Sequence, residues 1–266
     1  MTATLTVEGL KVAIGDANVL RGISLEVEPS EVRGLVGESG AGKSMLGRAV
    51  LGLSPSNATV TSGHIAFEGR DLLAMREVER RSLLGRRIAL IPQDPMTSLN
   101  PVKRVGAQIS SLLRHHLGLS KRAALSRATE LLTEVAIREP ERVLSLYPHE
   151  ISGGMRQRVL IAMAFACDPS LVIADEPTTA LDVTVQRQVL QLVERLRKRH
   201  GSAVLFITHD LGVVSSVADR VLVLERGRVR EEGTVGAVLD HPASSYTREL
   251  IAAVPRLPAS GIPAGS

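Results

Sequence analysis

Eight consecutive residues near the N-terminus have the types and spacing of a phosphate-binding loop. They fit the pattern G-x-x-x-x-G-K-[ST], between an expected strand and an expected helix, which is the setting this motif requires. Glycines let the backbone curl so that successive N–H groups point at phosphate oxygens, and the helix start adds partial positive charge. The residues are Gly37, Glu38, Ser39, Gly40, Ala41, Gly42, Lys43 and Ser44. We expect Lys43 to reach the β- and γ-phosphates of a nucleoside triphosphate and the Ser44 hydroxyl to bind Mg²⁺.

A second group of chemically active residues ends the apolar segment Leu171–Ala174. Two adjacent carboxylates, Asp175 and Glu176, follow it directly. Side chains alternate along a strand, so these two cannot do the same job. We expect Asp175 to hold Mg²⁺, directly or through water, and Glu176 to polarise the attacking water. Positioning matters more than basicity for such a water if the transition state is loose. The alternative is a surface acidic pair that caps a helix.

A third group combines a serine hydroxyl with two glycine N–H groups just before an expected helix. Ser152, Gly153 and Gly154 are followed by Gln157, and such a helix start can hold an anion. The tripeptide alone is also compatible with a glycine turn whose serine caps the helix. Three further polar groups occur singly: Gln93 and His209, which follow expected strands, and Asp182.

The order of these groups along the chain resembles that of ABC-type ATPases, over roughly residues 5–240. The resemblance implies that the Ser-Gly-Gly-x-x-Gln segment contacts ATP bound by a second ATPase subunit. It implies that Gln93 senses Mg²⁺ and the γ-phosphate, and that His209 contacts the γ-phosphate. Ala180, Leu181 and Asp182 look like the segment that crosses the dimer interface in that family.

Four longer segments resemble the peptide/nickel importer branch of this family: residues 93–101, 147–157, 176–184 and 246–250. The resemblance implies an ATPase that powers uptake of peptides, or of nickel or other small solutes. Its implied partners are two transmembrane permease subunits and an extracytoplasmic substrate-binding protein, and its implied location is the cytoplasmic face of the inner membrane. Whether the second ATPase subunit is identical or different stays open. The alternatives are an ABC ATPase acting on nucleic acid or ribosomes, a catalytically silent regulatory ATPase, and an exporter ATPase.

Three positions depart from that branch. Ile14 stands where the early strand usually supplies an aromatic side chain that stacks on adenine. Isoleucine can pack on the base but offers no π-face, so nucleotide affinity or base selectivity is expected to be weak. Ser244 and Ser245 replace the usual His-Pro pair before Tyr246. Many members continue into a cysteine-bearing extension, whereas this sequence contains one cysteine, Cys167, so no metal cluster is expected.

The elements that must position these groups predict an α/β fold. Apolar residues alternate with polar ones near the N-terminus, which indicates antiparallel strands. Further along, short apolar strands alternate with helices, which favours a P-loop NTPase core with a mostly parallel sheet. We therefore expect one ATPase domain over residues 1–240, with an all-helical insertion at about 102–158, and a short tail over 241–266.

Within the insertion, the stretch Ser120–Ile137 is predicted to be helical, with Ser120 as its N-cap. The apolar face is expected to comprise Ala124, Leu125, Ala128, Leu131, Leu132, Val135 and Ala136.

Composition limits the remaining possibilities. The 266 residues carry 32 basic and 28 acidic side chains, a formal net charge of +4, and only 2% aromatic residues. The positive charges are scattered and few aromatics are available to stack on bases, so no nucleic-acid partner is expected. No apolar run reaches the ~18 residues of a membrane helix. The expected ligands are ATP and Mg²⁺.

Overall fold

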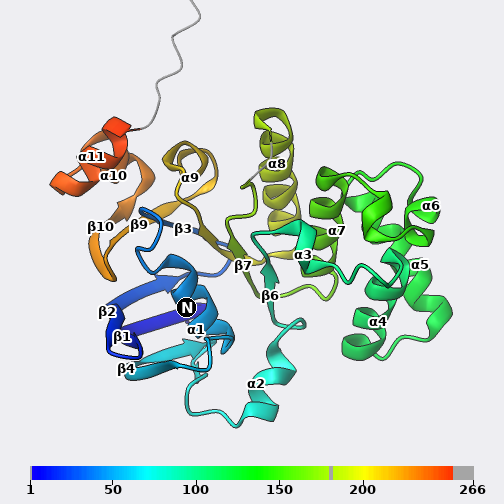
Figure 1. The fold of residues 1–266 in the computed structure, drawn as a ribbon, viewed down its shortest axis with the longest axis horizontal. Coiled ribbons are helices and arrows are strands. Elements are labelled where there is room, and N and C mark those ends of the chain that lie inside the picture. Colours follow the sequence, from blue (N-terminus) through cyan, green and yellow to red (C-terminus); the bar gives the residue numbers. More distant parts are fainter. Residues whose placement is uncertain (1, 180–181, 254–266) are drawn as a thin grey trace, which may run out of the picture.

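The computed structural model describes residues 2–179 and 182–253, and within them the chain forms two sheets flanked by helices (Figure 1). The first sheet is antiparallel, with strand order β2-β1-β4-β5. The second has the order β10-β9-β3-β8-β7-β6, in which only the β9–β10 pair is antiparallel. The strands are β1 Leu5–Ile14, β2 Ala17–Val27, β3 Val32–Val36, β4 Ala58–Phe67, β5 Arg70–Asp71, β6 Ile88–Ile91, β7 Leu171–Asp175, β8 Ala203–Ile207, β9 Arg220–Glu225 and β10 Arg228–Thr234.

Apart from α2, which follows β5 of the first sheet, the described helices follow strands of the second sheet, as expected for a mostly parallel sheet. They are α1 Lys43–Leu51, α2 Glu77–Leu83, α3 Pro95–Ser98, α4 Val105–Leu117, α5 Lys121–Glu134, α6 Pro140–Ser145, α7 Gly153–Phe165, α8 Val183–His200, α9 Leu211–Val217, α10 Val235–Asp240 and α11 Ser245–Ala253, with a 3₁₀ turn η1 at Pro148–Glu150. The predicted α/β fold class, with an antiparallel sheet before a mostly parallel one, is confirmed.

Between β6 and β7 the described chain contains helices and turns alone, from α3 to α7. The predicted N-cap is confirmed, because the Ser120 hydroxyl accepts a hydrogen bond from the Ala123 N–H over 3.2 Å. Two members of the predicted apolar face were wrong. Leu125 is 39% exposed, and Ala136 lies beyond the end of α5 with a positive φ of 57°. The helix ends at Glu134, so its periodicity no longer applies there.

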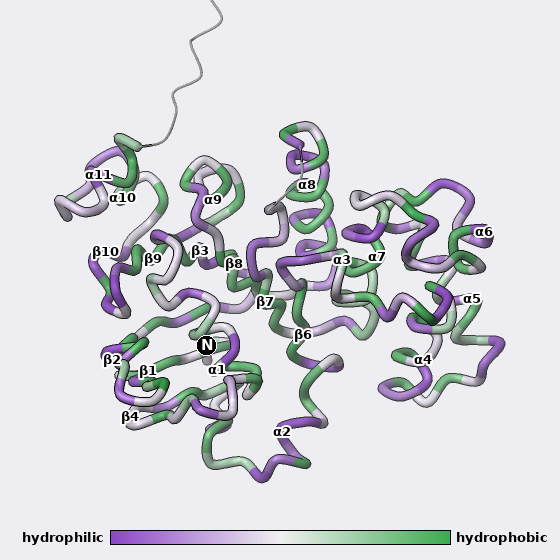
Figure 2. Tube along the Cα trace, in the orientation of Figure 1, coloured by the Kyte–Doolittle hydropathy of each residue, from purple (hydrophilic) through white to green (hydrophobic). Residues whose placement is uncertain are grey.

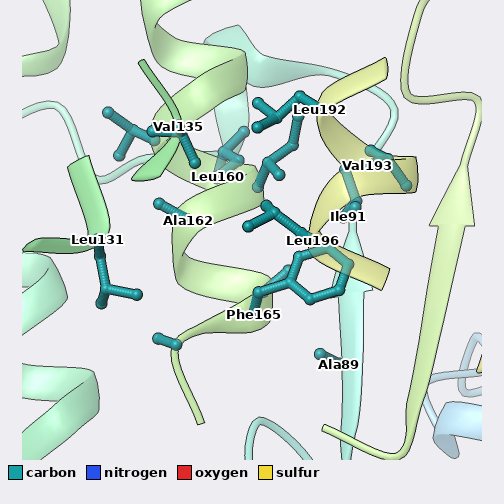
Figure 3. Close-up of a cluster of buried hydrophobic side chains, with 14 of the residues drawn as sticks. Ala89, Ile91, Leu131, Val135, Leu160, Ala162, Phe165, Leu192, Val193 and Leu196 are labelled. Carbon is teal, nitrogen blue, oxygen red and sulfur yellow. The ribbon is translucent and has the colours of Figure 1, made fainter. Parts of the chain in front are cut away.

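Two apolar clusters hold the parts of the chain together. One joins α5, α7, α8 and β6, and Figure 3 shows Phe165, Leu196 and Ile91 close together, with Leu131 at the left of the view. The other lies between the two sheets around α1 and includes Leu46 and Ile207. Figure 2 shows hydrophobic residues concentrated along the central strands. Burial of this apolar surface is the main force that brings the carboxyl ends of β3, β7 and β8 to one edge.

The boundary expected at residue 240 does not mark the end of the packed chain. Residues 245–253 form α11, and Tyr246 joins a third apolar cluster with Val36 and Val223. The predicted loose segment 255–266 lies outside the described residues. No described helix is both long and apolar enough to cross a membrane.

Candidate active site

The phosphate-type loop connects the buried strand β3 to helix α1, and its glycines are required by close contacts. A Cβ atom on Gly37 would lie 2.1 Å from the Leu224 carbonyl oxygen. A Cβ atom on Gly42 would lie 2.8 Å from Leu20 Cδ2, and Gly42 has a φ of 106°. Side chains are therefore excluded at both positions, and the surrounding strands hold the curled backbone.

Lys43 lies at the centre of this loop. It is only 4% exposed, and its Nζ donates hydrogen bonds to the carbonyl oxygens of Gly37 at 2.7 Å and Glu38 at 2.9 Å. Burial lowers the pKa of the Lys43 ammonium, and the nearby carboxylates of Glu176 and Asp175 oppose that shift. A buried ammonium inside a curled backbone is suited to bind a phosphate anion.

Ser44 and Asp175 meet across the site from different elements. The Ser44 hydroxyl, in the first turn of α1, donates to Asp175 Oδ1 at the end of β7 over 2.9 Å. Burial raises the pKa of Asp175, while the hydrogen bond from Ser44 opposes the rise. A hydroxyl and a partly desolvated carboxylate at hydrogen-bond distance are oxygen ligands of the kind that Mg²⁺ prefers, so these two residues fit that ion.

Glu176 occupies a strained backbone position, with a φ of 46°. Its carboxylate is oriented by three side chains. Gln93 Nε2 donates to Oε2 over 3.0 Å, and the Thr179 hydroxyl donates to the same oxygen over 2.9 Å. His209 Nδ1 lies 3.3 Å from Oε1. The fold therefore brings Gln93, Glu176 and His209 together.

Thr179 was missed by the sequence reasoning. It reaches the carboxylate because the chain turns tightly after Glu176, with the Thr179 N–H donating to the Glu176 carbonyl over 3.2 Å. The only signal in the sequence is a hydroxyl side chain three residues after the acid, a spacing that is common in turns.

The Ser-Gly-Gly segment lies at the start of α7, away from this cluster. The Ser152 hydroxyl caps α7 by accepting a hydrogen bond from the Met155 N–H. A Cβ atom on Gly153 would meet nothing within 4 Å, and one on Gly154 would meet only Val185 at 3.5 Å. Among the described residues, no hydrogen bond joins this segment to the loop 37–44. The segment is therefore open rather than enclosed.

Gln157 and Asp182 each make a hydrogen bond within the chain. Gln157 is 1% exposed, and its Nε2 donates to the Pro177 carbonyl over 2.8 Å. A direct contact between Gln157 and a nucleotide would require this side chain to leave its place. The Asp182 carboxylate caps α8 by accepting from the Val185 N–H over 2.9 Å. The preceding Ala180 and Leu181 lie outside the described residues.

Ile14 ends β1, opposite Ala17 and Ala58 in the neighbouring strands. Its side chain is half-buried against the cluster around α1. The β1–β2 hairpin also approaches the phosphate-type loop, since Leu20 of β2 lies against Gly42. The expected role of Ile14 beside a base stays a prediction.

Known proteins share both the sequence and the fold. The ABC transporter family matches residues 20–179. The chain is 47% identical to the oligopeptide transport ATP-binding protein OppD of Bacillus subtilis, over 98% of this chain and 74% of that protein. It is 48% identical to the probable D,D-dipeptide transport ATP-binding protein DdpD of Escherichia coli, over 91% of this chain and 74% of that protein.

Solved structures agree with these sequence matches. One is the ATP-binding cassette MJ0796 in a dimeric post-hydrolysis state bound to ADP and Pi, with a TM-score of 0.77, 25% identity, and coverage of 87% of this chain and 98% of that one. Another is an ATP-binding subunit of an ABC transporter, with a TM-score of 0.75, 30% identity, and coverage of 94% and 99%. Together with the site, these matches show that the chain belongs to the ABC transporter family, as a subunit that binds and hydrolyses ATP.

Proposed function

We propose that this chain powers the uptake of peptides through two transmembrane permease subunits, to which it binds at the cytoplasmic face of the inner membrane. An extracytoplasmic binding protein would deliver the peptide. The proposal is supported by the 47% identity to an oligopeptide transport ATP-binding protein. It is also supported by a 44% identical dipeptide transport ATP-binding protein, DppD, from Bacillus subtilis. Nickel and other small solutes are the alternative cargo class.

The observation that carries the ATPase mechanism is the environment of Glu176. Its Oε2 accepts from Gln93 and Thr179, whereas Oε1 has one close partner among the described residues, His209. A carboxylate oxygen has two lone pairs, so Oε1 keeps one acceptor position for a water molecule. Glu176 would orient this water for attack on the γ-phosphate, and Gln93 and Thr179 would hold the carboxylate in place.

The phosphate groups of ATP would lie in the loop 37–44, where Lys43 supplies positive charge. Ser44 and Asp175 would hold Mg²⁺, which supplies charge neutralisation at the β- and γ-phosphates. His209 would contact the γ-phosphate from the other side of the Glu176 carboxylate. Its Nδ1 lies 3.3 Å from Glu176 Oε1. These roles agree with the chemistry of the side chains: an ammonium for phosphate, oxygen atoms for Mg²⁺ and an imidazole for the γ-phosphate.

The open Ser152–Gly154 segment would complete the ATP site of a second ATPase subunit, either a copy of this chain or a related one. ATP would then add contacts that exist only in the closed dimer, which is the condition for shifting the equilibrium toward closure. Hydrolysis would remove those contacts, and the dimer would open. These movements would switch the permease subunits between inward-facing and outward-facing states.

The test uses Glu176→Gln, which removes the charge but keeps the shape of the side chain. We expect ATP turnover to fall at least about 100-fold, because orientation of the water is lost. We expect Mg-ATP to convert the variant from monomer to dimer in size-exclusion chromatography with light scattering. Glu141→Gln, at an exposed position of α6, is the matched control.

The outcomes separate the parts of the proposal. A variant that binds ATP and stays monomeric contradicts a homodimer and points to a different partner ATPase. Undiminished turnover in Glu176→Gln contradicts the assigned role of Glu176. Cargo is tested by uptake of labelled peptide and of nickel in cells that carry Glu176→Gln. Unchanged peptide uptake there would overturn peptide transport by this chain.

A further inference from the structure

The last described helix, α11, returns to the phosphate-binding loop. The Glu38 N–H donates a hydrogen bond to the Tyr246 hydroxyl over 3.3 Å, across 208 residues of sequence. In Figure 1, α11 lies beside β10 and α10, next to the edge of the parallel sheet. This contact comes from the segment that the sequence analysis assigned to the tail, and the ATPase mechanism above makes no use of it.

The position of Tyr246 is determined by its surroundings. The Glu231 carboxylate, on the edge strand β10, accepts hydrogen bonds from the N–H groups of Ala243 at 2.7 Å and Ser244 at 3.1 Å. These two bonds anchor the chain immediately before α11. The Tyr246 ring is 9% exposed and packs in the cluster that contains Val36. Val36 is the residue just before Gly37, so the ring contacts the strand that leads into the loop.

The phosphate-binding loop has two other supports from the C-terminal part of the chain. The Gly227 N–H donates to the Ala41 carbonyl over 2.9 Å. The Leu224 carbonyl closes the space beside Gly37. Both contacts come from the β9–β10 hairpin. The N–H of Glu38 donates to Tyr246, and Glu38 is an exposed residue. Tyr246 therefore supports a part of the loop that the hairpin does not contact.

We propose that Tyr246 is a positioning residue for nucleotide binding, and that its hydroxyl holds the first turn of the loop in its curled shape before nucleotide arrives. A loop that is ordered in advance loses less conformational freedom when phosphate binds, so affinity rises. The ring fills the core in either case, and the hydroxyl is the part that acts on the loop. This inference rests on ATP binding at residues 37–44.

The experiment compares Tyr246→Phe with Tyr147→Phe in the full chain. Both changes remove one hydroxyl, and Tyr147 lies in the helical region, where its ring stacks on His149. We expect Tyr246→Phe to raise the Kd of ADP and ATP about two- to tenfold, the range that corresponds to loss of one hydrogen bond. We expect kcat at saturating ATP to stay within about twofold, because Tyr246 touches no reacting atom.

The rise in Kd at unchanged kcat is the readout that a purely structural role would not move, and hydrogen exchange shows whether the hydroxyl orders the loop. The Glu38 amide loses its acceptor in Tyr246→Phe, so exchange in the peptide covering residues 37–42 should accelerate before nucleotide is added. The control Tyr147→Phe should leave that peptide unchanged. Glu231→Gln, which weakens the anchor of residues 243 and 244, should raise the Kd in the same direction by a smaller factor.

Two results would overturn the inference while leaving ATP binding intact. One is an unchanged Kd in Tyr246→Phe with unchanged exchange at residues 37–42. The other is a lower melting temperature with an unchanged Kd, which would make Tyr246 a core residue alone. A wild-type chain that binds no nucleotide, and whose behaviour Lys43→Ala does not alter, would instead overturn the assignment of the ATP site itself.

Discussion

The loop 37–44 and the segment 152–154 both place glycines at the start of a helix, but the space around these glycines differs. Around the first, Gly37 and Gly42 have no room for a Cβ atom, because Leu224 and Leu20 lie within 3 Å of where it would be. Around the second, Gly153 has no neighbour within 4 Å of that position. Lys43 is buried in the first loop, whereas Ser152 in the second is exposed and serves only as a helix cap.

The difference shows which anion site one chain can complete. The glycines of the loop 37–44 are required by the chain's own backbone and side chains, so that site is formed within the subunit. Within residues 2–179 and 182–253, no close contact requires a glycine at 153 or 154. Their small size makes sense if a ligand held by another molecule approaches them closely, which agrees with the proposed dimer.

The largest expected effect concerns the enclosed loop. Gly37→Ala should destabilise the chain by about 3 kcal/mol or more, because the added Cβ meets a backbone oxygen and the φ of 152° is strained for alanine. Gly153→Ala should change stability by less than about 0.5 kcal/mol, since the site is open and alanine favours the helix. Urea unfolding of both variants measures this contrast. Equal losses would contradict it.

A substitution in the open segment should reduce ATP turnover much more than it reduces stability. Ser152→Arg places a bulky side chain where the second subunit would bring its ATP. We expect ATP turnover to fall at least about tenfold, with the Kd of ADP for the separate subunit unchanged. The change also removes the N-cap of α7, so the melting temperature should fall by about 2–4 °C, which corresponds to about 1 kcal/mol, while the subunit stays folded. Retained turnover would mean that the segment does not serve a partner's site.

A smaller effect is expected at the hairpin beside the enclosed loop. Ile14→Tyr restores an aromatic surface at the end of β1, and stacking on adenine should lower the Kd of ATP about fivefold, near the low end of measured stacking energies. Ile14→Leu, which changes shape without adding a π-face, is the matched control. A Kd that both variants leave unchanged would place the base elsewhere.

The smallest expected effect is on the stability linked to Asp175, one of the two proposed Mg²⁺ ligands. Burial raises the pKa of Asp175, so folding opposes its ionisation. The stability linked to this group is present below the unfolded value of 3.8 and is lost as pH rises through the higher folded pKa. Asp175→Asn should therefore raise the melting temperature at pH 7 by on the order of 2 °C, even though hydrolysis is impaired.

Melting curves between pH 4.5 and 7 check the sign of this effect. The advantage of Asp175→Asn should shrink as pH falls toward the folded pKa, because both chains then carry a neutral group. Asn keeps an oxygen that can accept the Ser44 hydroxyl. An advantage that grows at lower pH would show that burial is not the dominant influence on Asp175.

Local patterns in the sequence were enough for the central elements of the fold and for Lys43, Ser44, Asp175 and Glu176, whereas Gln93 and His209 entered through the resemblance to ABC-type ATPases and Thr179 was missed. Short apolar runs indicated β3, β6, β7 and β8, and the motif at residues 37–44 required the turn between β3 and α1. Ser44 and Asp175 meet because parallel strands bring their carboxyl ends to one edge. The prediction was less accurate for helix α5, where Leu125 is exposed and Ala136 lies beyond the helix end. A helix ends where tertiary packing no longer stabilises it, which the periodicity of the sequence does not show.

Contacts between distant segments had no such local pattern. The sequence by itself determined the residue types that we propose bind phosphate, hold Mg²⁺ and orient water, since these depend on short motifs and their backbone geometry. Only the tertiary structure decided that Thr179 orients Glu176, that Gln157 points inward to Pro177, and that Tyr246 supports Glu38. The reason is that a hydrogen bond across 208 residues depends on how sheets and helices pack, which side-chain spacing along the chain does not encode.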